Sequence, residues 1–200
     1  MNQNKYETEE IYEILKKRII QLEYEPGLVL NEVEVAEEFN TSRTPIRRVF
    51  QLLSTDKLLN IVPRFGAQVT PIDFKKMKDI FQVTRELDPF AVRLAIDRIS
   101  EENLKELEDI VKRLEGYDIS KDYHNAINDD ERFHEIIFIS CGNQWLQDIL
   151  KSLHYHTERL WHYSEQNFDS FDLFTNTLGK VLEAIKDKDK DKADKYAKEH

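Results

Sequence analysis

The sequence predicts a mostly α-helical protein in two parts: a small N-terminal part that ends in a β-hairpin, and a longer part that is helical throughout. Apolar residues recur at the i, i+3, i+4 spacing of amphipathic helices over most of the chain. Only five Gly and five Pro occur in 200 residues, too few for a loop-rich β-sandwich. One segment, residues 58–72, instead carries β-branched residues on either side of a Pro-Arg-Phe-Gly turn, which is typical of a hairpin.

Three short helices are expected before this hairpin, near residues 6–23, 33–39 and 42–53. Glu-Pro-Gly at 25–27 ends the first helix, Asn31 is suited to cap the second, and Asn40 is suited to the turn after it. Pro45 falls in the first turn of the third helix, where its missing N–H costs no hydrogen bond. Helices in this order followed by a hairpin make a winged helix-turn-helix over residues 1–72, a motif that enters DNA grooves.

From about residue 73 the pattern is helical, and residues 73–200 are expected to form an all-helical bundle. The expected helices are 73–99, 101–115, 120–140, 143–165, 171–187 and 189–200. A polar stretch at 164–170 separates two of them, and Asn143 is a candidate N-cap. Alternating lysine and aspartate at 186–192 indicates a solvated turn between the last two helices.

Composition limits the surroundings and the partners. The formal net charge of −10 gives no overall attraction for nucleic acid, so any such binding requires a local basic patch. The single cysteine, Cys141, excludes an internal disulfide and suits a reducing cytoplasm. The N-terminal MNQNKYETEE is polar and acidic, unlike a signal peptide, and no apolar run approaches the roughly 18 residues of a membrane span. The sequence therefore predicts a soluble, cytoplasmic protein with no membrane partner.

A basic patch does occur, in the stretch TSRTPIRRVF. Arg43 lies at the N-terminal end of the third helix, with Arg47 one turn on and Arg48 beside it. Arginine pairs with guanine edges, and Ser and Thr hydroxyls suit phosphate oxygens. Between residues 41 and 70 five basic residues stand against one acidic residue, a net charge of +4 (five minus one). Either this face binds duplex DNA, with Arg64 of the hairpin entering a minor groove, or it is a solvated helix face with incidental arginines.

The segments EPGLVLNEVEVAEEFNTSRTPIRRVFQLL and NIVPRFGAQVTPI resemble the N-terminal domain of the GntR superfamily of bacterial transcription regulators. The matching features are the PG-x-x-L-N-E opening, the SRTPIR helix start, and the hairpin glycine followed by Val69. The basic patch and the resemblance together imply contacts with double-stranded operator DNA through Arg43, Thr44, Arg47, Arg48, Arg64 and Gly66. Arg48 stands where relatives usually carry Glu, and Val33 where many carry Arg, so operator preference is expected to differ.

The helical part carries a candidate pair of metal ligands in DDERFHEIIFISCGN. Asp130 and His134 are four residues apart, so on a helix they project from one face and can ligate one cation. Imidazole suits zinc, nickel and related ions, and a carboxylate adds a hard oxygen ligand. The alternatives are a surface ion pair or a core histidine held by a hydrogen bond.

RELDPFAVRLAI, DERFH and SCGN are similar to the all-helical effector domain of the FCD (FadR C-terminal domain-like) subfamily of GntR regulators. Its members commonly hold a divalent metal with one Asp and three His, beside a small carboxylate effector. The resemblance implies Asp130, His134 and His200 as three of the ligands, whereas the remaining His is replaced by Leu178. His156, on the face of the helix that carries Leu153 and Leu160, is either a substitute at this site or a core histidine bonded to a neighbour.

Arg85, in VTRELDPF, is the second candidate for the effector site. An arginine opposite a metal can hold an organic carboxylate with two parallel hydrogen bonds. The alternative is an ion pair with Glu86 or Asp88.

We therefore expect a ligand-responsive transcriptional regulator that binds operator DNA as a homodimer and senses a small organic acid, with a divalent metal such as zinc or nickel. An enzyme is not expected, because no nucleophile–base pair, glycine-rich phosphate loop or H-E-x-x-H motif is present. The alternative is a constitutive DNA-binding regulator whose helical domain only dimerises and has lost metal and effector binding, which the missing histidine makes credible.

Overall fold

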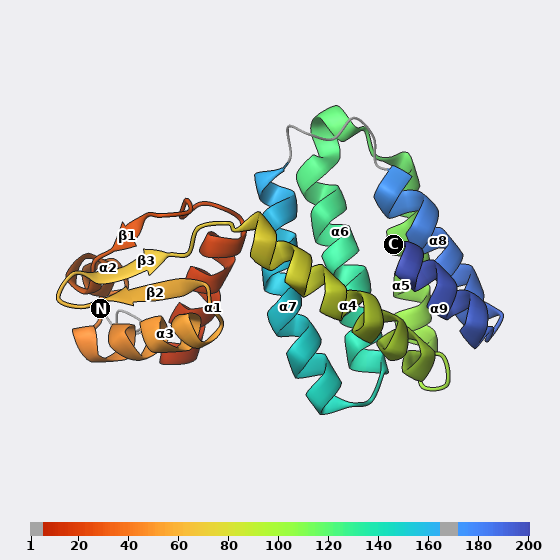
Figure 1. Cartoon of the computed structure of the whole chain (residues 1–200), viewed down its shortest axis with the longest axis horizontal. Helices are drawn as coiled ribbons and strands as arrows, with labels where there is room; N and C mark the ends of the chain where they lie inside the picture. The colour runs from red at the N-terminus through yellow and green to blue at the C-terminus, as the bar shows by residue number, and fades with distance from the viewer. Residues whose placement is uncertain (1–5, 165–171) are drawn as a thin grey trace, which may run out of the picture. The chain divides into compact units, whose positions relative to one another are not determined.

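The computed structural model describes residues 6–164 and 172–200 and divides the chain into two compact units (Figure 1). The first unit is Met1–Asp73 and the second is Phe74–His200. The division falls one residue after the end of the DNA-binding domain expected from the sequence.

The N-terminal unit consists of three helices and a small antiparallel sheet. Its elements are α1 (Thr8–Ile20), β1 (Val29–Leu30), α2 (Glu32–Glu38), α3 (Arg43–Thr55), β2 (Leu59–Val62) and β3 (Gly66–Val69). The strand order is β1-β3-β2, so the expected hairpin gains a third strand that the sequence did not predict. Helix α1 packs against α3, and their buried aliphatic side chains form the core.

Local signals fix these helices as the sequence predicts. The Asn31 side chain accepts a hydrogen bond of 2.8 Å from the backbone N–H of Val33 and thereby caps α2. Asn40 has a φ of 48°, the left-handed conformation that this residue type tolerates, and it makes the turn into α3. Helix α3 buries Ile46 and Val49 on one side and leaves its arginines on the other.

Gly66 is required where β3 passes β1. Its φ is 125°, which residues with a Cβ rarely adopt. A Cβ built at this position would lie 2.0 Å from the backbone oxygen of Leu30. This glycine therefore allows the close approach of the third strand.

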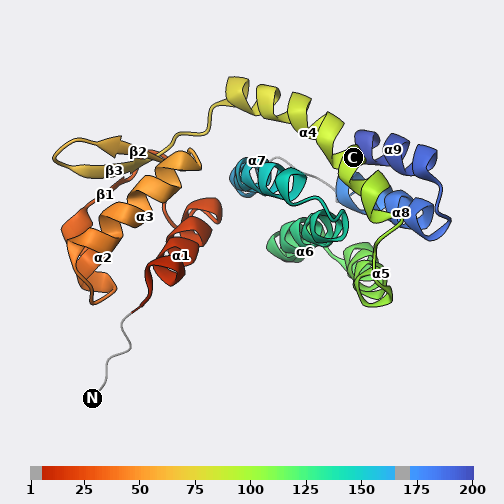
Figure 2. The same cartoon turned by 90° about the horizontal axis from the view of Figure 1, so that it is seen from below.

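The C-terminal unit is a bundle of six helices within the described residues (Figure 2). They are α4 (Phe74–Ala95), α5 (Glu101–Gly116), α6 (Ile119–Ser140), α7 (Gln144–Tyr163), α8 (Asp172–Lys186) and α9 (Lys190–Glu199). Helix α4 packs against α6, α7 and α9, while α8 packs against α5 and α9. The helix bounds lie within four residues of those expected from the sequence.

A continuous apolar core occupies the centre of this bundle. It includes Ala91, Leu107, Phe133, Ile137 and Leu182, each nearly or fully buried. Asn143 caps α7, as predicted, by accepting a hydrogen bond from the backbone N–H of Leu146 at 3.2 Å. None of the described helices combines the length and the apolar character needed to cross a bilayer.

The clash at Gly66 gives a stability prediction. Gly66→Ala is expected to lower the free energy of unfolding by about 3 kcal/mol, because it adds a steric clash to an unfavourable backbone conformation. Gly27→Ala is the matched control, since Gly27 also has a positive φ but no atom lies within 4 Å of the added Cβ. Its expected cost is about 1 kcal/mol. Urea denaturation measures both, and equal losses would contradict the role assigned to the β1–β3 approach.

Candidate functional site

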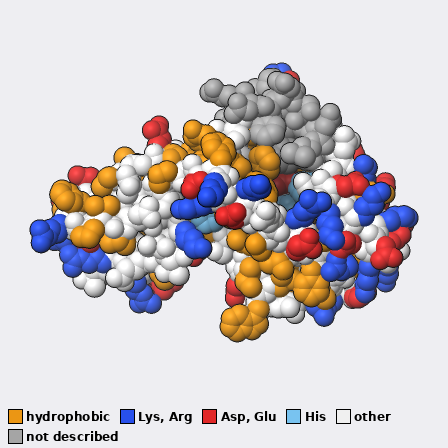
Figure 3. Space-filling view, viewed as in Figure 1, with side chains coloured by type: hydrophobic (Ala, Val, Ile, Leu, Met, Phe, Trp, Pro, Cys, Tyr) orange, Lys and Arg blue, Asp and Glu red, His pale blue; other side chains and the backbone are white. Residues whose placement is uncertain are grey.

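The start of α3 presents a basic surface. Arg43, Thr44, Arg47 and Arg48 are all exposed, because the buried side of the helix is taken by its aliphatic residues. We call these four residues the recognition surface. Figure 3 shows Lys and Arg side chains gathered at the end of the N-terminal unit where α3 begins and where β2 turns into β3. The helix start also offers free backbone N–H groups, which favour phosphate.

Two of these arginines share one carboxylate. Glu32 Oε2 accepts hydrogen bonds from Arg43 Nη2 at 2.9 Å and from Arg47 Nε at 2.8 Å. Burial by itself raises the pKa of the Glu32 carboxyl, but the bonds from Arg43 and Arg47 hold it below its usual value. The two arginine side chains are still 55% and 57% exposed, so the carboxylate orients them without covering them.

The turn between β2 and β3 forms a wing beside this surface. Arg64 lies in this turn with a φ of 72° and is exposed. A groove runs between the wing and the helix starts, lined by residues that include Glu32, Arg43, Arg47 and Phe65. Gly66 faces β1, so its conformation explains its presence without any DNA contact.

The helical unit contains a cavity of about 190 Å³. Helices α4, α6 and α7 each contribute residues at the i, i+3, i+4, i+7 spacing of one helix face, and α9 contributes its end. The lining residues are Phe81, Thr84, Arg85 and Asp88; Ile127, Asp130, Glu131 and His134; His154, Thr157, Glu158 and Trp161; and Ala197, Lys198 and His200. The sequence-predicted Asp130, His134, His200 and Arg85 are thus brought together in one cavity.

Asp130, His134 and His200 form a compact ligand set. His134 Nε2 lies 3.2 Å from His200 Nε2. Asp130 Oδ1 lies 3.3 Å from His200 Nε2, and Asp130 Oδ2 lies 3.8 Å from His134 Nε2. Two ligands bound to a tetrahedral zinc ion at 2.0–2.1 Å would lie about 3.3 Å apart, so the two imidazole nitrogens and the Asp130 carboxylate suit one ion.

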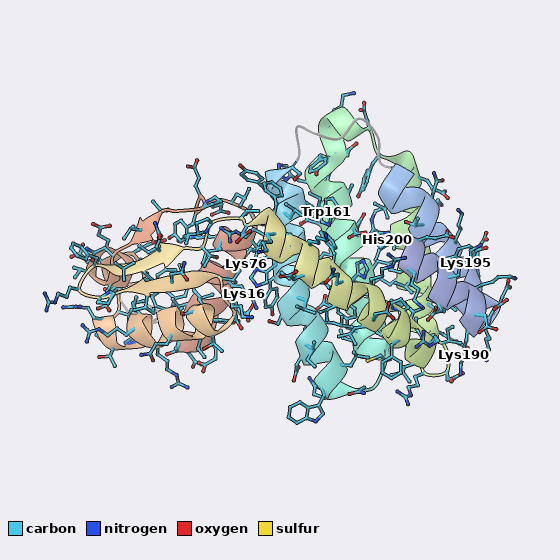
Figure 4. The ribbon with its side chains drawn as sticks, in the orientation of Figure 1. Lys16, Lys76, Trp161, Lys190, Lys195 and His200 are labelled. Atoms are coloured by element: carbon cyan, nitrogen blue, oxygen red, sulfur yellow. The ribbon has the colours of Figure 1, made fainter. Side chains whose placement is uncertain are left out.

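The surroundings of this set also favour a cation. Asp130 is almost fully buried, and its Oδ1 receives no hydrogen bond of normal geometry from a described residue. Burial, together with the charge of His154, lowers the pKa of His134 to about 4, which keeps this imidazole neutral and able to bind a metal. His200, labelled among the helices of this unit in Figure 4, has Thr177 Oγ1 2.7 Å from its Nδ1. This contact leaves Nε2 to face His134 and Asp130.

His154, which the sequence analysis did not select, takes a buried place beside this set. Its Nε2 lies 3.2 Å from Asp88 Oδ1 and its Nδ1 lies 3.7 Å from Glu131 Oε2. Burial alone would lower its pKa, but Asp88 and Glu131 raise the pKa of His154 to about 10. Asp88, His134 and His154 also form a second group of potential ligands. His156, predicted for an interior position, is half-buried and does not line the cavity.

The other predicted positions are resolved as follows. Leu178 is buried and lines a smaller cavity together with His134 and His200, the place expected for the missing ligand. Arg85 is exposed at the larger cavity, and within the described residues it makes no ion pair with Glu86 or Asp88. His124 and His162, which do not line the larger cavity, lie with their Nδ1 atoms 3.3 Å apart.

These features define a class of protein. A winged helix-turn-helix unit with an exposed basic helix start is joined to a helical unit with a polar, ligand-sized cavity. This is the arrangement of a transcriptional regulator in which one chain carries a DNA-binding unit and a second, helical unit.

The chain belongs to the GntR family of bacterial regulatory proteins and carries an FCD domain. The model of the GntR family matches residues 7–69, and the model of the FCD domain matches residues 79–200. The family and its characterised members are transcriptional regulators, which confirms the expectation that the protein is not an enzyme.

Individual relatives agree with this assignment. The chain is 31% identical over 201 residues to the HTH-type transcriptional regulator YdhC of Bacillus subtilis (strain 168), covering 96% of this chain and 86% of that one. It is 29% identical to the gluconate operon transcriptional repressor of Bacillus licheniformis, covering 88% and 74%. The solved structure of E. coli McbR/YncC has the same fold, with a TM-score of 0.80, 22% identity and coverage of 94% and 90%.

The buried ion pair between Asp88 and His154 gives a pH-dependent prediction. Asp88→Asn is expected to destabilise the protein by about 3 kcal/mol at pH 6, because it leaves a buried imidazolium without its main partner. Because the pKa of His154 is raised in the folded protein, its protonation stabilises the fold fully below the unfolded pKa of about 6.5. This stabilisation is lost as the pH rises through the folded pKa of about 10. The difference from wild type should therefore be smaller at pH 9 than at pH 6.

Thermal unfolding at both pH values measures this difference. Asp109→Asn, at an exposed position of α5, is the control and should change stability little at either pH. A loss for Asp88→Asn that grows toward pH 9 would show that His154 is not held as a cation.

Proposed function

We propose that this protein is a ligand-responsive regulator that binds double-stranded operator DNA as a homodimer and senses a small carboxylate metabolite with the help of a divalent metal. It would act in the bacterial cytoplasm, where operator DNA lies. The observation that carries the proposal is that one chain has both an exposed basic helix start and a cavity lined by a compact group of potential metal ligands.

The DNA-binding part of the proposal rests on the recognition surface. Arg43 and Arg47 are suited to guanine edges, and Thr44 to phosphate. Arg48 adds charge beside them, and Arg64 projects from the wing toward an adjacent groove. Gly66 contributes by shaping the wing.

The metal-binding part rests on Asp130, His134 and His200. Two imidazole nitrogens 3.2 Å apart, each within 3.8 Å of an oxygen of the Asp130 carboxylate, suit zinc or nickel and leave room for a fourth ligand. When bound, the ion would supply a positive charge that an effector carboxylate can meet. Arg85 of α4, exposed at the same cavity, would hold the effector carboxylate.

The homodimer is supported by apolar side chains on the surface of the helical unit. Trp145 is 82% exposed, and Ile149, one turn further along α7, is 48% exposed. Figure 3 shows hydrophobic side chains gathered at the edge of this unit where α7 begins. Exposed apolar patches of this kind commonly mark protein interfaces. A dimer would place two recognition helices on two half-sites and so multiply a modest single-site affinity.

A second candidate is a regulator that dimerises and binds DNA without a metal or effector. Leu178 favours it, because an apolar side chain stands beside His134 and His200 where a further ligand is expected. Metal and ligand binding separate the two candidates.

For DNA binding, Arg47→Ala is expected to weaken operator binding about ten- to a hundredfold, because one arginine contact to a base edge is lost. A gel-shift titration with DNA from the protein's own promoter region measures this. Lys17→Ala removes one exposed positive charge from α1 and is the matched control, with a much smaller expected effect. If wild type and Arg47→Ala bind equally poorly even at low salt, the protein is not a regulator of this kind.

For metal binding, His134→Ala is expected to abolish the bound zinc or nickel of the purified protein, whereas His124→Gln, outside the ligand set, should retain it. Leu178→His is expected to raise metal affinity about tenfold or more, because it supplies a further imidazole beside His134 and His200. Elemental analysis and metal-induced shifts in melting temperature measure both effects. Equal metal content in wild type and His134→Ala would remove the proposed site and favour the second candidate.

A further inference from the structure

The cavity is layered along the three helices that line it. At one end Phe81 of α4 lies beside Trp161 of α7, with ring centroids 6.2 Å apart. At the other end Asp88 contacts His154, and the rings of His134 and His154 are 4.6 Å apart. By the helical spacing, the layer between these ends is formed by Thr84 and Arg85 of α4, Asp130 and Glu131 of α6, and Thr157 and Glu158 of α7.

This middle layer carries both signs of charge. Arg85 comes from α4, whereas Glu131 and Glu158 come from the two facing helices. We propose that the effector is a small amino carboxylate, whose ammonium group lies between Glu131 and Glu158 and whose carboxylate faces Arg85 and the Asp130–His134–His200 set. This inference rests on the proposed function and names the chemical class of its effector.

Within the described residues, Glu131 and Glu158 each have one histidine partner, and both contacts are long. Glu131 Oε2 lies 3.7 Å from His154 Nδ1, and Glu158 Oε1 lies 3.8 Å from His162 Nε2, both longer than a hydrogen bond. His154 is already engaged more closely by Asp88 at 3.2 Å. The Glu158 side chain is only 13% exposed, so water adds little to its long contact with His162.

The electrostatics of Glu158 show the same deficit. Burial raises the pKa of the Glu158 carboxyl, His162 offsets part of this rise, and the negative charge of Glu131 adds to it. An ammonium group between the two carboxylates would reverse both effects, because it supplies the opposite charge and donates up to three hydrogen bonds.

The neighbouring aromatic end suits the same group. Phe81 and Trp161 line the cavity next to the acidic layer. A cation that lies over an aromatic face gains additional attraction. Thr157, on the same face of α7 as Glu158, lines this part of the cavity.

The opposite side suits a carboxylate. Arg85 makes no ion pair within the described residues, whereas Lys198, the other basic residue at the cavity, lies 2.9 Å from Asp194 Oδ2. A cavity of about 150 Å³ accepts a molecule the size of benzene, so 190 Å³ accommodates an amino acid-sized ligand.

A matched panel tests this inference. The full chain is titrated with the protein amino acids, with the corresponding acids that lack the amino group (succinate against aspartate, propionate against alanine), and with simple alkylamines. Isothermal titration and melting temperature are measured with and without added zinc. At least one amino acid is expected to bind tenfold or more tightly than both its deaminated counterpart and the alkylamines.

Variants then locate the ammonium site. Glu158→Gln is expected to weaken binding of that amino acid about ten- to a hundredfold and to leave binding of its deaminated counterpart unchanged. Glu131→Gln should act in the same direction and provides a second test if the first variant folds poorly by circular dichroism. Glu115→Gln, at an exposed position of α5, is the matched control and should bind like wild type.

Each of the other outcomes contradicts a different part of the proposal. If deaminated acids bind as tightly as amino acids, or if neither glutamate variant discriminates between them, the amino carboxylate inference is wrong while the carboxylate effector site stands. If alkylamines alone bind as tightly, the carboxylate contact with Arg85 is wrong. If no compound binds with or without zinc, the proposed effector site fails as well.

Discussion

The helical unit is organised by the need to neutralise carboxylates inside a bundle. An ionised carboxyl group removed from water costs several kcal/mol unless a cation or several donors meet it. Asp88 meets this need with His154, and Asp130 meets it in part with His134 and His200. Because these partners come from α4, α6, α7 and α9, the same requirement that holds the helices in register also creates a cavity whose polar groups converge.

One helix that lines the cavity is covalently joined to the N-terminal unit. Helix α4, which carries Arg85 and Asp88, begins at Phe74, directly after the last residue of the N-terminal unit. A ligand that binds Arg85 therefore acts on the helix to which the winged unit is covalently joined. It can change DNA binding only to the extent that it binds two arrangements of that helix with different affinity.

The sequence predicted most of the fold because its signals are local: helix periodicity, the Asn31 and Asn143 caps, and the turn at Asn40. Strand β1 was missed because two residues carry no periodicity, and its pairing with β3 depends on contacts across the unit. The sequence favours His156 over His154 because His156 shares a face of α7 with Leu153 and Leu160, and this face also carries Ile149. The Ile149 side chain is 48% exposed, so it belongs to a surface patch. Counting such apolar surface residues as core places the buried face of α7 at the wrong angle around the helix.

If Arg43 and Arg47 contact DNA as proposed, the Glu32 carboxylate held between them affects how the protein distinguishes one DNA sequence from another. A phosphate that approaches these arginines competes with a counter-charge that the protein already carries, so a chance encounter with the duplex backbone gains less than two free guanidinium groups would give. A base edge that accepts two hydrogen bonds can displace the Glu32 carboxylate from an arginine, whereas a phosphate at a less favourable distance does not. One acidic side chain would thereby weaken non-specific DNA binding more than it weakens binding to the operator.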